Sequence, residues 1–474
     1  MTQTPERPLQ ELLAALPSID SLLAEPVLSK PGLPARPLLV RLCRQEVERL
    51  RTGLKSGKRR HLPETGTLAS QIADQARRLL TGGMLHVINA TGVILHTGLG
   101  RAPLPEQARE ALQRITRSFT NLEFRLETGA RGVRHERVAE LLCLLTGAEG
   151  ALVCNNNAAA VLLMLQTLCR RREVIVSRGQ QVEIGGGFRI PDVIRESGAR
   201  MVEVGTTNRT HASDYLQALG PRTAALLRVH PSNYRISGFT SQVELGELAR
   251  LAREHGCLLL DDLGSGALHE LGGFREPEPL VEQSLAAGAD LVSFSGDKLL
   301  GASQAGLLVG RRELIARLEK APLLRALRCD KLGLAVLEAV LSIHAEGGEA
   351  LAALPVHRML SESREQVRLR ARNSLTVLGV APDAIEFTLG HGRIQVVDSL
   401  ARTGSGALPE EDVASVALRI TSSKLSAARL QRDLRCGTPA VVGAVREEAL
   451  WLDFKAILPG EETLLGESLA GVLN

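Results

Sequence analysis

A single lysine separates two apolar runs in the segment Asp290-Leu-Val-Ser-Phe-Ser-Gly-Asp-Lys-Leu-Leu-Gly-Ala-Ser-Gln-Ala-Gly-Leu-Leu-Val-Gly310. Short apolar runs bounded by glycine and serine are typical of buried strands. Burying the charged amine of Lys298 between them is costly, but the same burial lowers its pKa and makes the amine a nucleophile that can bond an aldehyde. The segment by itself equally allows a lysine in the surface turn of a hairpin.

A second strand, which ends in two acids, precedes this lysine in Cys257-Leu-Leu-Leu-Asp-Asp-Leu-Gly-Ser-Gly266. Ligands of open α/β sheets bind at the carboxyl ends of strands, and a carboxylate there can keep a pyridinium nitrogen protonated, as pyridoxal phosphate chemistry requires. Asp262 is favoured over Asp261, because Ser265 follows it by three residues and can reach the cofactor's phenolic oxygen. The alternatives for the acidic pair are a helix N-cap and a metal site.

A third element combines a strand, a polar turn and a helix in Ala151-Leu-Val-Cys-Asn-Asn-Asn-Ala-Ala-Ala160 and the apolar residues that follow. Asn155, Asn156 and Asn157 are good N-cap residues. Small side chains in the first helical turn allow a ligand to approach the free N–H groups, which bind anions. We therefore expect this turn to hold the phosphate of the cofactor, with an ordinary capped helix as the alternative.

Length and composition limit the classes of protein to which the chain can belong. The 474 residues are enough for two or three domains, and no apolar run is long enough to cross a membrane. The N-terminus lacks the pattern of a secretory signal. Seven scattered cysteines without a CxxC pair predict neither a disulfide framework nor a zinc site, and no metal is expected. These features suit a protein of the reducing cytoplasm.

Hydrophobic periodicity predicts three domains. Residues 1–80 show helical spacing of leucines, residues 81–345 alternate strands with helices, and residues 346–474 form a smaller α+β unit. The alternation predicts a mainly parallel sheet covered by helices. Its expected strands are residues 85–88, 151–154, 174–176, 200–204, 224–229, 258–260, 291–294 and 306–309. Further helices are expected at residues 279–287, 311–328, 334–344, 359–372 and 426–433, and further strands at 394–397, 416–420, 441–445 and 450–454.

Basic residues of interest lie in residues 36–60 and at three single arginines further along the chain. Residues 36–60 contain nine lysines or arginines against two glutamates, a bias that suits the phosphates of a nucleic acid, although a solvated basic face is the alternative. Arg325 and Arg328 are three residues apart and share one helix face, so together they can clamp an anion. Arg101 lies in a glycine-rich loop. An ordinary surface salt bridge is the alternative for each of these three.

The motifs that carry chemistry occur together in one known family. They are Asn89-Ala-Thr-Gly-Val-Ile-Leu-His-Thr-Gly-Leu-Gly-Arg-Ala-Pro103, Asn155-Asn-Asn-Ala-Ala-Ala160, Asp262-Leu-Gly-Ser-Gly266, Ser293-Phe-Ser-Gly-Asp-Lys-Leu-Leu-Gly301 and Leu324-Arg-Ala-Leu-Arg-Cys-Asp-Lys331, with residues 121–124, 126–129, 182–185 and 188–192. The chain thereby resembles the bacterial selenocysteine synthases, the L-seryl-tRNA(Sec) selenium transferase (SelA) family. The resemblance covers nearly the whole chain.

The resemblance implies an α/β fold of the fold-type I pyridoxal phosphate enzymes. It implies that Lys298 is the Schiff-base lysine, that Asp297 is its active-site neighbour, and that Arg101, Arg325 and Arg328 bind anions. It also implies a tRNA-binding N-terminal domain and a homo-oligomer of dimers, typically a decamer. Active sites of this fold usually lie between the subunits of a dimer.

The implied reaction converts seryl-tRNA(Sec) to selenocysteinyl-tRNA(Sec). The seryl hydroxyl is expected to leave as water, so that an aminoacrylate remains on the cofactor and selenophosphate supplies the selenium. Lys298 is expected to move the Cα proton and to share the proton transfers with Asp297. Two other functions remain open, a pyridoxal phosphate lyase for a small amino acid or amino sugar acid, and a tRNA-binding protein without catalysis. The basic residues 36–60 argue against the first, and Lys298 with Asp262 argues against the second.

Overall fold

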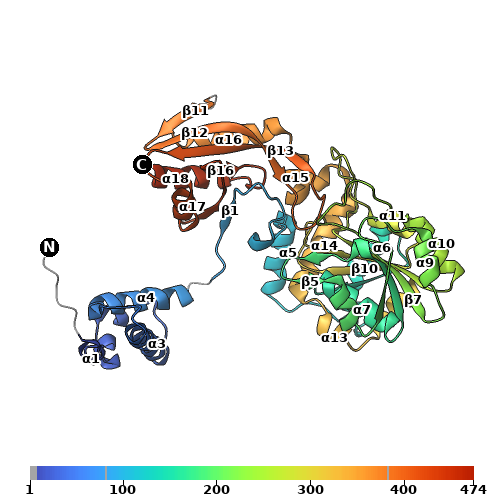
Figure 1. Cartoon of the computed structure of the whole chain (residues 1–474), viewed down its shortest axis with the longest axis horizontal. Coiled ribbons are helices and arrows are strands. Elements are labelled where there is room, and N and C mark those ends of the chain that lie inside the picture. Colours follow the sequence, from blue (N-terminus) through green and yellow to red (C-terminus); the bar gives the residue numbers. More distant parts are fainter. Residues whose placement is uncertain (1–7, 81–82, 382–383) are drawn as a thin grey trace. The chain divides into compact units, whose positions relative to one another are not determined.

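A computed structural model describes residues 8–80, 83–381 and 384–474 (Figure 1). Contacts between residues divide the chain into two compact units, residues 1–86 and residues 87–474. Within the described residues, no helix is long and apolar enough to cross a membrane. The three-domain division at residues 80 and 345 stays a prediction.

The first unit is a small helical bundle. It contains α1 (Leu9–Ala14), α2 (Ile19–Leu23), α3 (Arg36–Lys55) and α4 (Thr65–Leu80). Apolar residues three and four apart on α3 and α4 point into one shared core, while the charged residues of α3 other than the buried Glu46 remain outside. The helical character predicted for residues 1–80 is confirmed.

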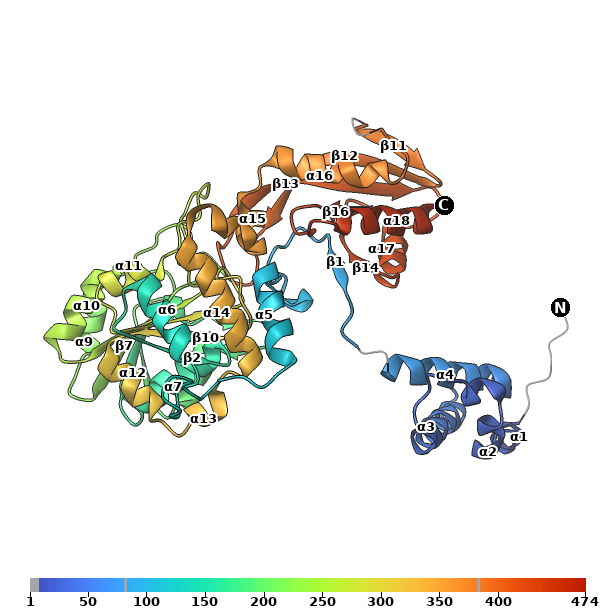
Figure 2. The same ribbon diagram turned by 180° about the vertical axis from the view of Figure 1, so that it is seen from behind.

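A seven-stranded sheet forms the centre of the second unit (Figures 1 and 2). Its strand order is β2-β10-β9-β8-β7-β3-β6, and six strands are parallel while β10 runs against both of its neighbours. The prediction of a mainly parallel sheet is confirmed. The strands are β2 (Gly150–Cys154), β3 (Glu173–Ser177), β6 (Arg200–Val204), β7 (Thr223–Val229), β8 (Leu258–Gly264), β9 (Leu291–Ser295) and β10 (Gly306–Gly310).

Helices cover both faces of this sheet, because alternate residues of each strand point to opposite faces. In β2, Ala151 and Val153 join one buried cluster, whereas Leu152 and Cys154 join the other. The first cluster includes residues of α5 (Glu106–Thr116), α6 (Glu136–Thr146), α10 (Leu245–Glu254), α11 (Val281–Ala286) and α14 (Lys331–Glu346), and the second those of α7 (Asn157–Cys169), α8 (Ile190–Glu196) and α12 (Arg312–Glu319). Two buried faces explain why most residues of these strands are apolar.

A second sheet is antiparallel, with the order β11-β12-β13-β16-β15. Its strands are β11 (Glu386–Leu389), β12 (Gly392–Arg402), β13 (Asp412–Ser422), β16 (Ala449–Asp453) and β15 (Ala444–Arg446). Apolar residues from α16 (Arg364–Thr376), α17 (Ala427–Arg435) and α18 (Glu461–Leu473) share its core. The α+β character expected for the C-terminal region is confirmed, although β11 was not predicted.

Four predicted elements differ from the structure. The strand expected at residues 85–88 is β1 (Val87–Asn89), which pairs with β14 (Ala440–Val442) and not with the central sheet. The helix expected at 311–328 is divided into α12 and α13 (Leu324–Leu327), because Pro322 cannot donate a helical hydrogen bond. The helix expected at 359–372 is likewise divided into α15 (Pro355–Ser361) and α16. The strand expected at 441–445 is divided between β14 and β15.

Candidate active site

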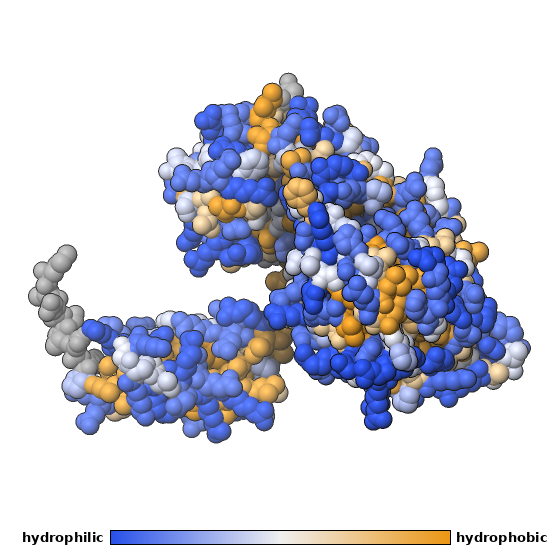
Figure 3. All heavy atoms as spheres, turned by 45° about the vertical axis from the view of Figure 1, so that its right-hand side comes forward, coloured by the Kyte–Doolittle hydropathy of each residue, from blue (hydrophilic) through white to orange (hydrophobic). Residues whose placement is uncertain are grey.

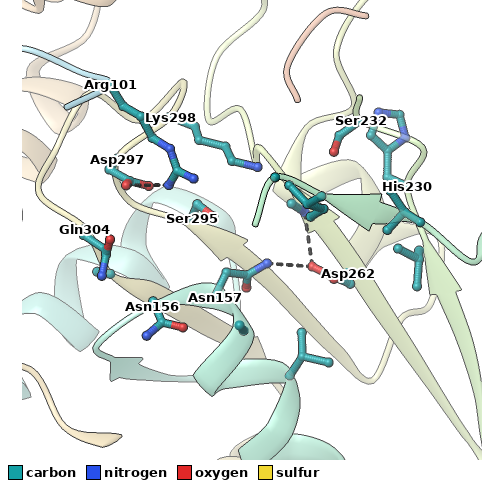
Figure 4. Close-up of a pocket in the computed structure, with 18 residues that line it drawn as sticks. Arg101, Asn156, Asn157, His230, Ser232, Asp262, Ser295, Asp297, Lys298 and Gln304 are labelled. Atoms are coloured by element: carbon teal, nitrogen blue, oxygen red, sulfur yellow. Dashed lines mark hydrogen bonds and ion pairs between the residues drawn. The ribbon is translucent and has the colours of Figure 1, made fainter. Parts of the chain in front are cut away.

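A cavity opens at the carboxyl ends of β7, β8 and β9, where the first turn of α7 meets them (Figure 4). Its volume is about 240 Å³. This is the edge at which open α/β sheets bind ligands. The polar side chains that line it are Arg101, Asn156, Asn157, His230, Ser232, Asp262, Ser295, Asp297, Lys298 and Gln304.

Lys298 lies in the turn between β9 and β10 and is buried, with 4 % of its surface exposed. Burial lowers the pKa of its amine, and the nearby Arg101 cation lowers it further, while the carboxylates of Asp262 and Asp297 oppose the shift. A methyl group added to Gly264 would lie 3.8 Å from Lys298 Nζ. The amine therefore reaches the end of β8 and has the lowered pKa that a nucleophile or base needs.

Asp262 is the aspartate of β8 that faces the cavity. Its Oδ1 accepts hydrogen bonds from Asn157 Nδ2 at 2.8 Å, Ser293 Oγ at 3.1 Å and the N–H of Gly264 at 3.2 Å. Burial raises the pKa of its carboxyl group, and the donors from Asn157 and Ser293 partly offset that rise. Asp261 instead bonds Arg228 Nη1 at 3.0 Å and does not line the cavity.

Asp297 and Arg101 form an ion pair at the rim of the cavity. Arg101 Nη1 lies 2.7 Å from Asp297 Oδ2, and the two side chains are 29 % and 10 % exposed. The backbone of Arg101 has a φ of 63°, an uncommon conformation for a residue other than glycine. The pair places one positive and one negative group beside Lys298 (Figure 4).

The first turn of α7 forms the opposite wall. Asn156 is its N-cap residue, and its side chain accepts the N–H of Ala159 at 2.9 Å. A Cβ on Gly306 would lie 2.1 Å from the Asn156 carbonyl oxygen, so only glycine lets β10 approach this turn. The positive end of the α7 dipole faces the cavity and suits an anionic group.

Four of the predicted site residues lie outside this cavity. Asn155 donates its backbone N–H to Leu327 at 2.7 Å, and Ser265 is buried with its hydroxyl donating to Glu278. Arg325 and Arg328 line another cavity, of about 330 Å³, where Arg328 Nη1 lies 3.8 Å from Glu123 Oε1. The roles expected for these four residues remain predictions.

Two cavity residues that the sequence analysis missed come from the end of β7, namely His230 and Ser232. The N–H of His230 donates to the Asp262 carbonyl at 2.9 Å, and burial lowers the pKa of its imidazole to about 4. The missed signal was present in the sequence, because a histidine follows the mostly apolar residues 224–229 at the same edge as Asp262. Ser295 and Gln304, on either side of Lys298, were also missed.

Two histidines, the buried His344 and the half-buried His357, support the turn that carries Lys298. His344 Nε2 lies 2.9 Å from the Leu300 carbonyl oxygen, and His357 Nε2 lies 3.1 Å from that of Leu299. A carbonyl oxygen only accepts, so each Nε2 must carry the proton. Burial lowers the pKa of His344 to about 3 and so keeps its ring neutral. The two hydrogen bonds fix the backbone just after Lys298.

Substitution of Asp262 tests the electrostatics of the cavity. In Asp262→Asn the negative charge is lost while the shape is kept, and we expect turnover to fall about 10²-fold because a charged group at a reacting centre is removed. Asp261→Asn is the matched control, since its partner Arg228 lies outside the cavity lining. The two turnover numbers are compared at equal cofactor occupancy, and equal losses in both variants would contradict the role of Asp262.

These residues fit pyridoxal phosphate. Lys298 supplies an amine of lowered pKa for the aldehyde, Asp262 supplies a carboxylate for the ring nitrogen, and the first turn of α7 suits the phosphate. Asn157 Oδ1 is buried without a hydrogen-bond partner in the described part of the chain. Such an atom is costly unless a ligand donates to it.

Comparison with known proteins shows which family the chain resembles over most of its length. The family model "SelA: L-seryl-tRNA selenium transferase" matches residues 87–458. The L-seryl-tRNA(Sec) selenium transferase of Carboxydothermus hydrogenoformans is 42% identical over 473 residues, covering 98% of this chain and 99% of the relative. The L-seryl-tRNA(Sec) selenium transferase of Moorella thermoacetica is 45% identical over 466 residues, which cover 98% of this chain and 97% of the relative.

The solved structures support the fold. The structure of D-glucosaminate-6-phosphate ammonia-lyase superposes with a TM-score of 0.58 at 20% identity, covering 84% of this chain and 97% of that one. The chain has the fold of the fold-type I pyridoxal phosphate enzymes, and its cavity lies at the carboxyl ends of the strands, where open α/β sheets bind ligands. On the matches over nearly its whole length, the chain belongs to the L-seryl-tRNA selenium transferase family.

Proposed function

We propose that the chain converts seryl-tRNA(Sec) to selenocysteinyl-tRNA(Sec), with pyridoxal phosphate as cofactor and selenophosphate as selenium donor. The observation that carries the proposal is the buried Lys298 beside Asp262, in a chain of the selenium transferase family. Overall, the serine Cβ exchanges its C–O bond for a C–Se bond. The hydroxyl leaves as water and one water cleaves the P–Se bond, so phosphate is the only net by-product.

Three groups of the chain hold the cofactor. Lys298 would bond its aldehyde, Asp262 would hold the proton of its ring nitrogen, and the backbone N–H groups of the first turn of α7, where Asn156 and Asn157 lie, would bind its phosphate. When bound, pyridoxal phosphate supplies an electron sink for the carbanion at the serine Cα. Asn157 also fixes Asp262 through the 2.8 Å hydrogen bond between their side chains.

Lys298 also takes the Cα proton of the seryl group. Its lowered pKa leaves a share of neutral amine, which a general base requires. Asp297 lies next to it in the chain and pairs with Arg101 at 2.7 Å. We assign Asp297 to the proton transfers that accompany loss of the hydroxyl group, with Arg101 setting its orientation.

Selenophosphate is a multiply charged anion and needs cations near the cavity. Arg101 is on its wall, whereas Arg325 and Arg328 line the neighbouring cavity of the same chain. We propose that the active form is a homo-oligomer, a decamer built from five dimers, in which active sites are shared between subunits. Arginines of one subunit would then complement the cavity of another.

Apolar surface on the second unit supports assembly. Large hydrophobic side chains are exposed there, among them Phe119, Leu126, Leu144 and Phe239, which are 104%, 68%, 75% and 83% exposed. Figure 3 shows hydrophobic side chains gathered among hydrophilic ones on the face in view. A contiguous exposed group of hydrophobic side chains, such as the one in that view, is typical of protein–protein contact sites.

The first unit supplies the tRNA contacts. Residues 36–60 carry nine basic residues against two acidic ones, and the exposed face of α3 presents several of them. Phosphate contacts made by such residues provide affinity and are weakened by salt. We place the reaction in the cytoplasm, where charged tRNA is available and the seven cysteines remain free thiols.

The test is the complete reaction. Purified protein loaded with pyridoxal phosphate is incubated with seryl-tRNA(Sec) and selenophosphate, and the amino acid released from the tRNA is identified by mass spectrometry. Selenocysteine is expected only when both substrates are present. Release of ammonia from a free amino acid or amino sugar acid, without selenium transfer, would instead favour a lyase.

A further inference from the structure

Glu278 is a buried carboxylate that lies outside the lining of the cavity. Its side chain is 2 % exposed. One oxygen, Oε2, accepts the N–H of Leu408 at 2.9 Å, and the other, Oε1, accepts the hydroxyl of Ser265. Burial raises the pKa of its carboxyl group, while these two donors favour the charged form.

His230 lies next to this carboxylate. Its Nε2 is 3.8 Å from Glu278 Oε1, and that nitrogen is buried without a hydrogen-bond partner in the part of the chain that the structure describes. His230 itself lines the cavity, whereas Glu278 does not. A movement of less than about 1 Å by either side chain would bring the pair into hydrogen-bond range.

The same carboxylate joins segments that are distant in the sequence. Ser265 follows the end of β8, and His230 follows the end of β7. Leu408 belongs to the connection between β12 and β13 of the second sheet. That connection reaches the cavity wall, because a Cβ on Gly406 would lie 3.0 Å from Ser232 Oγ.

The charge of Glu278 also acts directly on Lys298, but it is the smallest of the causes that set the pKa of that amine. Burial is the main cause of the lowered pKa of Lys298, and Glu278 is among the carboxylates that oppose it. The other groups that face the amine are Asp262 on β8, Asp297 in the same turn and the Arg101 cation. None of these interactions requires Glu278 to touch the cofactor.

We propose that Glu278 is a positioning residue, which orients the cavity-lining His230 and couples it to the β12–β13 connection. The inference rests on the proposed cofactor site. Glu278, although buried outside the cavity, would thus have a function in the reaction. Its carboxylate would act through the imidazole of His230.

The test measures the absorption of the bound cofactor against pH in the full-length protein. Glu278→Gln keeps the shape and a hydrogen-bond acceptor but removes the charge. We expect the midpoint of the absorption change to fall by about one pH unit, because loss of a nearby negative charge disfavours the protonated, cationic form. In a His230→Asn background, the same substitution should shift the midpoint by less than about half as much, since the residue that transmits the effect is gone.

Glu411→Gln is the matched control. Glu411 is a buried glutamate of the same β12–β13 connection, and its Oε2 accepts the N–H of Arg275 at 3.2 Å, away from the cavity lining. This variant should leave the midpoint unchanged. If Glu278→Gln proves too unstable, Glu278→Asp keeps the charge but shortens its reach, and a shift of the midpoint with full cofactor occupancy is expected.

Two results would overturn the inference. An unchanged midpoint in both Glu278 variants would show that the carboxylate is only structural, and a full shift in the His230→Asn background would show that its charge acts without the imidazole. The proposed cofactor site would survive either result. Absence of the absorption band from the unaltered protein would overturn the cofactor site together with the inference.

Discussion

Lys298→Ala should abolish the absorption band of the lysine-bound cofactor and lower turnover about 10⁴-fold. The alanine leaves no amine to bond the aldehyde, and it also removes the group that takes the Cα proton, a contribution of about 10²–10⁴ by itself. The cavity otherwise remains, because Asp262 and the first turn of α7 keep their own hydrogen bonds. Absorption spectra and single-turnover rates measure the two losses.

Lys455 provides a matched control for this prediction. It is also a buried lysine, 1 % exposed, whose pKa is lowered mainly by burial, but its Nζ donates to the Glu362 carbonyl at 2.6 Å, outside the cavity. Lys455→Ala should weaken folding and keep the band. Retention of the band in Lys298→Ala would refute the assignment of Lys298, whatever the control shows.

The alternation of strands and helices was predictable because both faces of the central sheet are buried. That burial makes each strand a short apolar run, which the sequence displays directly. The direction of β10 could not be predicted from its apolar run, because a buried strand has the same apolar pattern whether it pairs in parallel or in antiparallel. The short turn between β9 and β10, which carries Lys298, is the local reason that these two strands run in opposite directions.

Breaks within periodic segments were harder to predict than the segments themselves. Residues 441–445 are one β-rich run, yet Gly443 divides them between two sheets. A Cβ there would lie 2.5 Å from Leu452 Cδ2 and 2.6 Å from the Trp451 carbonyl oxygen, so close packing requires glycine. This requirement depends on residues of β16 and is absent from the local pattern.

The site was predictable to the extent that its residues lie at strand ends. Lys298, Asp262 and Asn157 each follow an apolar run, and the structure brings them to one cavity. Glu278 has no such signal, because it lies in a loop and gains its partners from the ends of β7 and β8 and from residue 408. Contacts between distant segments of this kind are visible only in the folded chain.

Neutralising four exposed basic residues of the first unit should weaken tRNA(Sec) binding about 10³-fold. Arg41, Arg44, Lys55 and Lys58 are exposed, and none of them makes an ion pair within the described residues. Removing one cation from a phosphate should lower the slope of log K against log salt by about one, so the slope of the quadruple glutamine variant should fall by about four. Gel-shift titrations at several salt concentrations measure both quantities.

Arg49 and Arg51 provide the control on the same helix. Arg49 pairs with Glu46 at 2.7 Å, and Arg51 pairs with Glu48, so their charges are already balanced and neutralising both should change the salt slope by less than about one. The core of the first unit is formed by apolar residues, and neither variant alters it. If the salt slope fell by the same amount per removed charge in the two variants, α3 would contribute only a diffuse positive electrostatic potential. An unchanged affinity in the quadruple variant would move the tRNA site away from α3.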